Sequence, residues 1–216
     1  VEELIEHGAR AFVSAAYAYK IPPIPESRAY GLNIHPTLLP KGRSRWPLPY
    51  ILLDQPEAAG ITIHKLSPTF DAGDVLAQKP LSLGVEDDLE TLTAKIVMQT
   101  PSLLSELMQD LPVRWAQAQP QDEDKASFWP LPDEEFRRID WSWPVDEILR
   151  RHRAFGRAMV LAELEGQKIW IESLNGWSEV HPYPPGHIVM QMDREIVVAA
   201  RDGLVVIKSW LPYAAW

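Results

Sequence analysis

Proline clusters limit where regular structure can run in this chain of 216 residues. Twenty prolines are present, and many fall in four short stretches, at residues 21–25, 46–49, 129–132 and 182–185. Because proline fixes φ and removes a backbone N–H donor, such stretches are typical of fixed, non-repetitive connections. Helices and strands are therefore expected between these stretches.

The first part of the sequence predicts strands and short helices in alternation. Residues 11–17 are continuously apolar but for one serine, which is typical of a strand buried on both faces of a parallel sheet. Residues 32–35 predict a short strand that ends at Pro36. The other predicted elements are the end of a helix at residues 1–8, a helix at 47–54, an alternating strand at 60–66 and a strand at 75–83.

A long amphipathic segment, residues 86–111, follows these elements. Its leucines and isoleucine recur at helical spacing, and Pro101 is expected to kink or divide the helix. Residues 112–138 lose this periodicity and are rich in Gln, Asp, Pro and Lys, which indicates a linker. The rest predicts a small β-rich, barrel-like module, with a helix at 145–155 and strands at 168–171, 188–192, 195–199 and 204–210.

Composition narrows the classes of function. The formal net charge of −9 disfavours nucleic-acid binding without excluding a local basic face, since phosphate neutralisation by Lys and Arg supplies most of that affinity. There is no cysteine, so thiolate chemistry and cysteine-ligated metals are excluded, and the histidine spacings suggest no metal site. No apolar run is long enough for a membrane span and no signal segment opens the chain, so a cytoplasmic protein is expected.

A candidate catalytic group lies in the stretch LNIHPTLLP, residues 32–40. Asn33 and His35 are two residues apart, so on an extended segment their side chains point the same way. Asp71, in the stretch TFDAGD at 69–74, can be brought against the imidazole by a glycine-containing turn, or can simply form that turn. Amide, imidazole and carboxylate together provide an oxyanion donor and an acid/base pair. His64 is expected on the surface or across a strand pair, and Asp74 as a turn or cap residue.

A basic loop follows the same stretch. Lys41, Arg43 and Arg45 are close together in a chain that is otherwise acidic. Two interpretations remain open for this loop, a solvated connection or a clamp that binds an anionic substrate beside His35.

Taken together, residues 32–40, 60–64 and 70–78 resemble the folate-dependent formyltransferase family. The similarity extends through residues 120–126 and 138–142, which resemble the linker of methionyl-tRNA formyltransferases, and through 147–155 and the later Gly-containing turns, which resemble their C-terminal domain. This resemblance implies an α/β fold with a partial Rossmann-like formyltransferase sheet, followed by the small β-rich, barrel-like domain. The domains it implies are residues 1–111 for the catalytic part, 112–140 for the linker and 141–216 for the C-terminal domain.

The same resemblance implies an enzyme of one-carbon metabolism that transfers a formyl group from 10-formyltetrahydrofolate to a primary amine. Asn33 would stabilise the oxyanion, His35 would stabilise it or move a proton, and Asp71 would orient His35. A small amine or an amino-sugar nucleotide is favoured slightly as acceptor over methionyl-tRNA. The implied cofactor-binding residues are Ala16, Tyr17, Ala18, Tyr19, Ile63, Phe70, Asp71 and Asp74, and the implied substrate-binding residues are Thr37, Lys41, Arg43 and Arg45.

The sequence departs from the family pattern at two places. The β-α units with which the family fold begins are missing from this sequence, so either a fragment or a diverged protein is expected, and a non-catalytic remnant that binds a metabolite or a partner stays open. Exposed sheet edges would then favour a homodimer. In the basic loop, Ser44 replaces the usual glycine, and Trp46 is expected to reshape the acceptor site.

Overall fold

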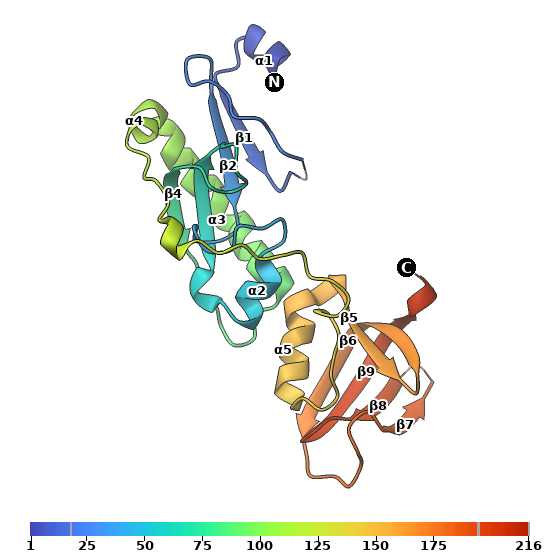
Figure 1. The fold of residues 1–216 in the computed structure, drawn as a ribbon. Coiled ribbons are helices and arrows are strands. Elements are labelled where there is room, and N and C mark those ends of the chain that lie inside the picture. Colours follow the sequence, from blue (N-terminus) through green and yellow to red (C-terminus); the bar gives the residue numbers. More distant parts are fainter. Residues whose placement is uncertain (18, 194, 216) are drawn as a thin grey trace. The chain divides into compact units, whose positions relative to one another are not determined.

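The structure, a computed structural model, describes residues 1–17, 19–193 and 195–215. Its contacts divide the chain into two compact units (Figure 1). The first unit comprises Val1–Val85 and Thr91–Leu131, and the second comprises Glu86–Glu90 and Pro132–Trp216. The predicted α/β class with a separate β-rich part is confirmed.

The first unit contains a four-stranded sheet in the order β1-β2-β3-β4. Its strands are β1 (Ala11–Ala15), β2 (Tyr30–His35), β3 (Gly60–Lys65) and β4 (Val75–Pro80). β1 runs parallel to β2, whereas the pairs β2–β3 and β3–β4 are antiparallel. The prediction that the first strand is buried on both faces is wrong, because β1 pairs only with β2 among the described strands and Val13 is 42% exposed.

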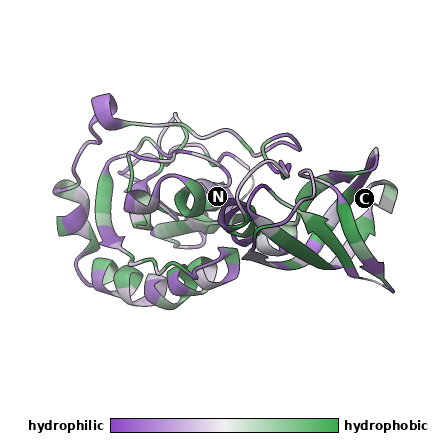
Figure 2. Cartoon of the chain, turned by 90° about the horizontal axis from the view of Figure 1, so that it is seen from below, coloured by the Kyte–Doolittle hydropathy of each residue, from purple (hydrophilic) through white to green (hydrophobic). Residues whose placement is uncertain are grey.

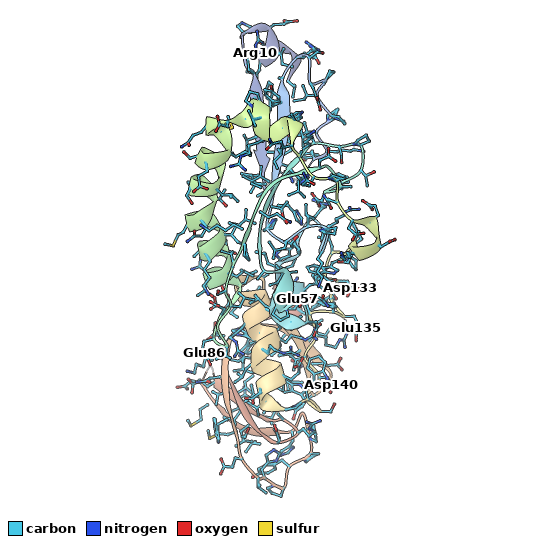
Figure 3. All side chains as sticks on the ribbon, turned by 90° about the vertical axis from the view of Figure 1, so that its left-hand side faces the viewer. Arg10, Glu57, Glu86, Asp133, Glu135 and Asp140 are labelled. Carbon is cyan, nitrogen blue, oxygen red and sulfur yellow. The ribbon has the colours of Figure 1, made fainter. Side chains whose placement is uncertain are left out.

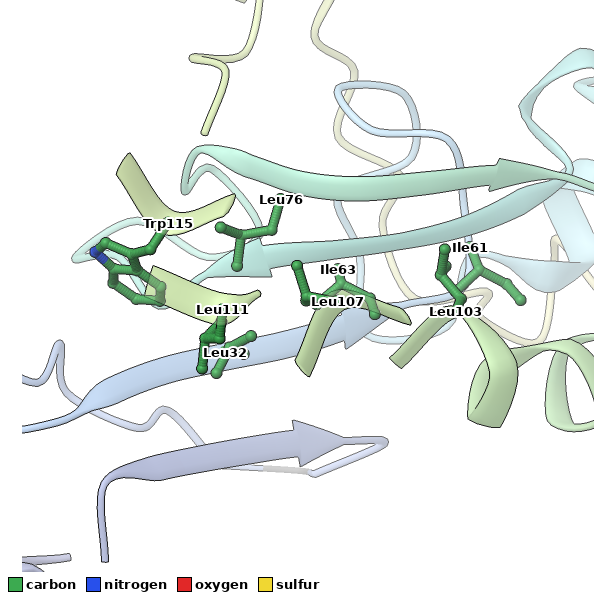
Figure 4. Close-up of a cluster of buried hydrophobic side chains, with 8 residues drawn as sticks. All are labelled: Leu32, Ile61, Ile63, Leu76, Leu103, Leu107, Leu111 and Trp115. Atoms are coloured by element: carbon green, nitrogen blue, oxygen red, sulfur yellow. The ribbon is translucent and has the colours of Figure 1, made fainter. Parts of the chain in front are cut away.

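Helix α3 (Leu89–Gln109) and helix α4 (Leu111–Ala116) supply apolar side chains to the sheet. Figure 4 shows how these side chains meet those of the strands in one buried cluster. Pro101 lies inside α3 without dividing it. The cluster consists of Leu32, Ile61, Ile63, Leu76, Leu103, Leu107, Leu111 and Trp115. Burial of this set fixes the face of the sheet that meets the helices, since each large apolar side chain contributes about 1.5–3 kcal/mol when removed from water.

Residues predicted as a linker belong largely to the first unit. After α4, Gln119 pairs with Val75 by two backbone hydrogen bonds, and a bridge joins Phe128 to Arg43. Trp129 is buried in a second apolar cluster, beside helix α2 (Leu48–Leu53) and the turn η1 (Pro56–Ala58). The sequence gives little sign of this order, because the contacts are hydrogen bonds and single aromatic contacts rather than a repeated apolar pattern.

The second unit contains an antiparallel five-stranded sheet in the order β5-β6-β9-β8-β7. Its elements are α5 (Val145–Phe155), η3 (Gly156–Ala158), β5 (Val160–Leu164), β6 (Gln167–Ser178), β7 (Ile188–Met192), β8 (Glu195–Ala199), β9 (Gly203–Pro212) and η4 (Tyr213–Ala215). Figure 2 shows the largely hydrophobic colouring of these strands. The predicted helix and four strands are confirmed. Strand β5 was not predicted; it begins directly after η3 and Met159, whose φ is +59°.

Two short elements complete the described part of the chain, the N-terminal helix α1 (Glu2–Glu6) and the turn η2 (Glu123–Lys125). Among the described residues, no helix is long and apolar enough to cross a membrane.

Candidate active site

Three polar side chains of the central strand pair converge on one point. Asn33 and His35 lie on β2, two residues apart, and therefore share a face of the sheet. His64, on β3, is the direct cross-strand partner of Asn33. His35 is 3% exposed and His64 is 2% exposed, so both imidazoles are removed from water.

The fourth polar side chain, Asp71, reaches the same point from the turn between β3 and β4. Its φ is +55°, a left-handed conformation that aspartate adopts more readily than most residues. Two residues later, a Cβ on Gly73 would lie only 1.9 Å from the Lys65 carbonyl oxygen. Only glycine therefore fits there, and the close approach of the turn to β3 directs the Asp71 carboxylate back over the sheet.

The four groups lie within contact distance of one another. Asn33 Nδ2 is 3.1 Å from His64 Nε2 and 3.5 Å from Asp71 Oδ1. The same Asp71 Oδ1 is 3.5 Å from His35 Nδ1 and 3.7 Å from His64 Nε2. The structure thus brings together all three predicted catalytic residues, and it adds His64.

Backbone carbonyls determine which ring nitrogens carry protons. His35 Nε2 lies 2.9 Å from the Gly42 carbonyl oxygen and must donate to it. His64 Nδ1 likewise donates to the Lys65 carbonyl oxygen at 2.8 Å. In the neutral rings, His35 Nδ1 and His64 Nε2 therefore present lone pairs toward Asp71 and Asn33. A proton that reaches His35 Nδ1 is stabilised by the adjacent carboxylate.

Burial and charge act in opposite directions on the ionisation of the site. Burial lowers the pKa of His35 below its ordinary value, although Asp71 and the Gly42 carbonyl oppose this shift. Burial alone would raise the pKa of Asp71, but contacts with His64, the charge of His35 and the Ser44 N–H together lower it below its ordinary value. At neutral pH the site therefore holds an ionised carboxylate beside a neutral imidazole.

The lowered pKa of His35 predicts a loss of stability in mild acid. As pH falls below about 6.5, the His35 imidazole of the unfolded chain binds a proton. In the folded chain the same imidazole binds a proton only at a lower pH. The free energy of unfolding therefore decreases between pH 7 and pH 5, and His35→Gln is expected to reduce this decrease. Urea titrations of both proteins at each pH measure it; an equal decrease in the two would contradict the assignment to His35.

A cavity of about 560 Å³ lies against these four groups. Its walls are mainly apolar and aromatic, with Ile34, Trp46, Phe70 and Pro101 among them. Of the residues predicted to bind the cofactor, those that line this cavity are Ala16, Tyr17, Tyr19, Phe70 and Asp71. Ala18, which the resemblance also implied, lies outside the described residues.

Two of the residues implied as cofactor contacts lie elsewhere. Ile63 is fully buried in the apolar cluster under α3, because it points to the opposite face of β3 from His64. Asp74 forms an ion pair with Lys65, with 3.4 Å between Oδ2 and Nζ, and does not line the cavity.

The three cations of the predicted basic clamp have different surroundings. Lys41 pairs with Glu57 (labelled in Figure 3) at 2.6 Å, and Arg43 is 8% exposed and pairs with Glu123 at 2.7 Å. Thr37 is fully buried and donates to the Lys41 carbonyl oxygen at 2.6 Å. Among the implied substrate contacts, Arg45 lines the cavity and these three do not.

Lys20 and Trp46 also line the cavity. Trp46 was expected to shape the acceptor site, while Lys20 carried no signal beyond its place after an aromatic stretch. The sequence carried no signal that places His64 here, since that depends on the register of the β2–β3 pair, which sets Asn33 opposite His64 on the face that carries His35.

Family models account for most of the chain. Residues 1–108 match the model described as formyl transferase, and residues 133–212 match the model of the formyl transferase C-terminal domain. The chain belongs to the formyl transferase family. The predicted enzyme class, a transferase of one-carbon groups, is thereby confirmed.

Known proteins agree with this formyl transferase assignment. The chain is 30% identical over 217 residues to the methionyl-tRNA formyltransferase of Streptococcus sanguinis, covering 98% of this chain and 68% of that protein. HypX from Aquifex aeolicus, in a variant form, has a TM-score of 0.79 at 21% identity, covering 99% of this chain and 41% of HypX. WlaRD, a sugar 3N-formyltransferase, has a TM-score of 0.65 at 17% identity, covering 96% of this chain and 76% of WlaRD.

Folates are present with two of these relatives. HypX has been solved in complex with tetrahydrofolic acid, and WlaRD in the presence of dTDP and 5-N-formyl-THF. The predicted donor, 10-formyltetrahydrofolate, belongs to the same class of compound as the folates in these two structures.

Proposed function

We propose that this chain transfers the formyl group of 10-formyltetrahydrofolate to a primary amine on an anionic acceptor, a nucleotide-linked amino sugar being the first candidate. The observation that carries this proposal is the joint placement of Asn33, His35 and Asp71 at one wall of the cavity. The direct test incubates the chain with 10-formyltetrahydrofolate and an amino-sugar nucleotide, and detects the formamide by mass. Absence of product with every amine offered would contradict the proposal.

The cavity suits a folate. A fused ring system of this kind needs apolar and aromatic walls with a few polar groups at fixed points, which is the composition observed. Tyr17, Tyr19 and Phe70 are 60%, 75% and 53% exposed, and Lys20 Nζ lies over the Phe70 ring at 5.6 Å from its centroid. These aromatic side chains, with the backbone of Ala16, would hold the donor.

A bound 10-formyltetrahydrofolate would supply an activated formyl group, which leaves the folate nitrogen as the bond to the amine forms and the amine proton passes to that nitrogen. Asn33 Nδ2 donates to the negative charge that develops on the formyl oxygen. Its contact with Asp71 is long at 3.5 Å, so this N–H can turn to a better acceptor. His64 orients the Asn33 amide through the 3.1 Å contact.

His35 and Asp71 accept the proton that the attacking amine releases. The lone pair of His35 Nδ1 and the Asp71 carboxylate together form a proton acceptor inside a site from which water is largely excluded. The Gly42 carbonyl fixes the ring so that Nδ1, rather than Nε2, faces the carboxylate. A proton released by the amine can be held here and returned.

Two cationic side chains beside the cavity favour an anionic acceptor. Apart from the catalytic site itself, the charged residues that line the cavity are Lys20 and Arg45, and neither has an ion-pair partner among the described residues. Two unpaired cations beside a cavity in a chain of net charge −9 favour an acceptor that carries phosphate or carboxylate.

Arg45→Gln is expected to raise the KM for an anionic acceptor roughly 10–100-fold, with kcat and the KM for the donor little changed, since one charge-assisted contact contributes roughly 1.5–3 kcal/mol. Steady-state kinetics with each substrate varied in turn measure the effect. Arg114→Gln, a matched change on the exposed face of α4, should leave all constants as in the wild type. An unchanged acceptor KM in Arg45→Gln would remove Arg45 from the acceptor site.

Methionyl-tRNA is the second candidate acceptor. It is favoured by the S. sanguinis relative, whose similarity runs across 98% of this chain and so includes the second unit. The two candidates differ in the number of phosphates contacted, hence in salt dependence. Filter binding of methionyl-tRNA in a salt series separates them: steep loss of measurable affinity with salt supports the tRNA, and no binding at low salt leaves the amino-sugar nucleotide.

A further inference from the structure

Residues 119–129 cross both loops that carry the catalytic groups, and we call them the bridging segment. At one end, Gln119 forms two backbone hydrogen bonds with Val75, at 2.9 and 2.7 Å. At the other end, Ser127 donates its N–H to the Pro40 carbonyl at 3.1 Å and accepts from the Arg43 N–H at 2.9 Å. The segment therefore pairs first with the strand after Asp71 and then with the loop after His35.

Gln121 lies between these two ends and bonds to both loops. Its Nε2 donates to the Asp71 carbonyl oxygen at 2.7 Å and to the Gly73 carbonyl oxygen at 2.8 Å. Its Oε1 accepts from Arg43, at 3.2 Å from Nε and 2.8 Å from Nη2. Both hydrogens and the oxygen of the carboxamide are thus engaged, an arrangement that no other side chain of similar size provides.

Arg43 is the second residue at the junction, by which we mean the hydrogen bonds that link Gln121 to the Asp71 turn and to the Arg43 loop. Its guanidinium also pairs with both carboxylate oxygens of Glu123, at 2.9 and 2.7 Å, so it is fixed in one orientation. The residue before it, Gly42, supplies the carbonyl that accepts from His35 Nε2. The loop anchored by Arg43 is therefore the loop that orients His35.

The turn that Gln121 holds needs such support. Asp71 has a φ of +55°, which is unfavourable for a residue with a side chain, and it persists only when neighbouring contacts determine it. Gln121 ties down the carbonyl groups on both sides of Ala72, and thereby fixes the peptide planes that aim the Asp71 carboxylate. An Asp71 displaced by 1 Å would leave the contacts with His35 and Asn33.

We propose that Gln121 is a positioning residue. Its carboxamide fixes the Asp71 turn relative to the Arg43 loop, and so keeps the Asp71 carboxylate at a fixed distance from the His35 imidazole. For its effect on catalysis this inference rests on the proposed formyl transfer. It assigns a role to a residue of the predicted linker.

The kinetic test replaces Gln121 by Met, which has a similar length and can neither donate to the two carbonyls nor accept from Arg43. We expect kcat to fall roughly 10–100-fold, because misplacement of a catalytic group by about 1 Å has effects of that size, while the KM values of donor and acceptor stay within about twofold. Gln119→Met is the matched control, because the Gln119 side chain is exposed and donates to the Gln117 carbonyl at 2.8 Å, away from both loops.

Gln121→Glu separates the two halves of the junction. A carboxylate still accepts from Arg43 but cannot donate to the Asp71 and Gly73 carbonyls. If positioning of the turn is the function, this variant loses kcat as Gln121→Met does. Retention of wild-type kcat in Gln121→Glu would overturn the proposal, because the contact with Arg43 alone would then suffice.

A titration without substrates decides the inference independently of activity. The Asp71 charge raises the pKa of His35, so a displaced carboxylate lowers it further. NMR titration of the histidine ring signals, with His35 assigned from His35→Gln, is expected to show a lower midpoint in Gln121→Met and an unchanged one in Gln119→Met. An unchanged midpoint in Gln121→Met overturns the positioning role, even if melting temperature falls. If the wild-type chain formylates no amine, the proposed function fails, but the midpoints still report on the junction.

Discussion

Asp71→Asn is expected to lower kcat for formyl transfer by roughly 10²–10⁴-fold, the range typical of a general acid–base group. The carboxylate is 11% exposed and lies 3.5 Å from His35 Nδ1, so its charge is poorly screened there. An amide of the same shape keeps the turn but removes the charge that stabilises a proton on His35. The substrates still bind, so the loss appears in kcat rather than in KM.

Steady-state kinetics at pH 7, with melting temperature measured in parallel, check this expectation. Asp110→Asn is a matched control, because Asp110 is exposed at the start of α4 and its side chain makes no capping hydrogen bond. A decrease of less than fivefold in Asp71→Asn would show that His35 works without the carboxylate, and the proton-holding role of the pair would have to be abandoned.

The loss in Asp71→Asn should depend on pH in a defined direction. In the wild type, the pKa of Asp71 lies below its ordinary value, so the carboxylate stays ionised through mild acid. As pH falls, His35 takes up a proton before Asp71 does and can then no longer accept one from the amine, so the acid limb of kcat/KM reports His35. The Asp71 charge raises the pKa of His35, so this limb should move to lower pH in Asp71→Asn. An acid limb at the same pH in both proteins would assign it to another group.

The shared direction of Asn33 and His35 was predictable, because they are neighbours on one strand face and spacing alone fixes their direction. The place of Asp71 was not fixed in this way, since a residue of a glycine-containing turn can equally form only the turn. The place of His64 was not predictable, since the pattern of a single strand does not say which residue of another strand it will face. That information is the register of the β2–β3 pair, which depends on the turn and on burial of the opposite face.

The basic loop shows a different limit of the sequence. Lys41, Arg43 and Arg45 are equivalent by composition, yet the structure gives the first two acidic partners and leaves Arg45 at the cavity. The partners, Glu57 and Glu123, lie far from the loop along the chain. Tertiary contacts therefore determine which cation is available to a substrate. The local sequence does not contain that information.

The ordered contacts of residues 119–129 were not predictable, for a related reason. A stretch of Gln, Asp and Pro lacks apolar periodicity, and periodicity is the main signal of regular structure. Here the order comes instead from a few saturated hydrogen bonds, above all those of Gln121, and from the burial of Trp129. Polar residues that bridge two loops look in sequence like residues that face water.

Asn33→Ala is expected to lower kcat by roughly 10²–10³-fold, the usual effect of removing one oxyanion donor, with the KM of the donor little changed. Asn33 Nδ2 is the side-chain amide donor placed between His64 and Asp71. The variant also leaves His64 Nε2 without its donor, so we expect the free energy of unfolding to fall by about 1 kcal/mol. Single-turnover rates of formyl transfer, together with urea titrations, measure both effects.

The outcome for Asn33 is best judged in combination with Asp71. Asn33→Ala and Asn175→Ala are the same change, but Asn175 is exposed on β6, and its variant should keep the wild-type rate. Because Asn33 and Asp71 touch, the two losses should not add: the double variant Asn33→Ala/Asp71→Asn is expected to be little slower than the slower single variant. If the two fold-losses in rate multiply in the double variant, the amide and the carboxylate act on the reaction independently. In that case Asn33 and Asp71 do not form a single cooperative site.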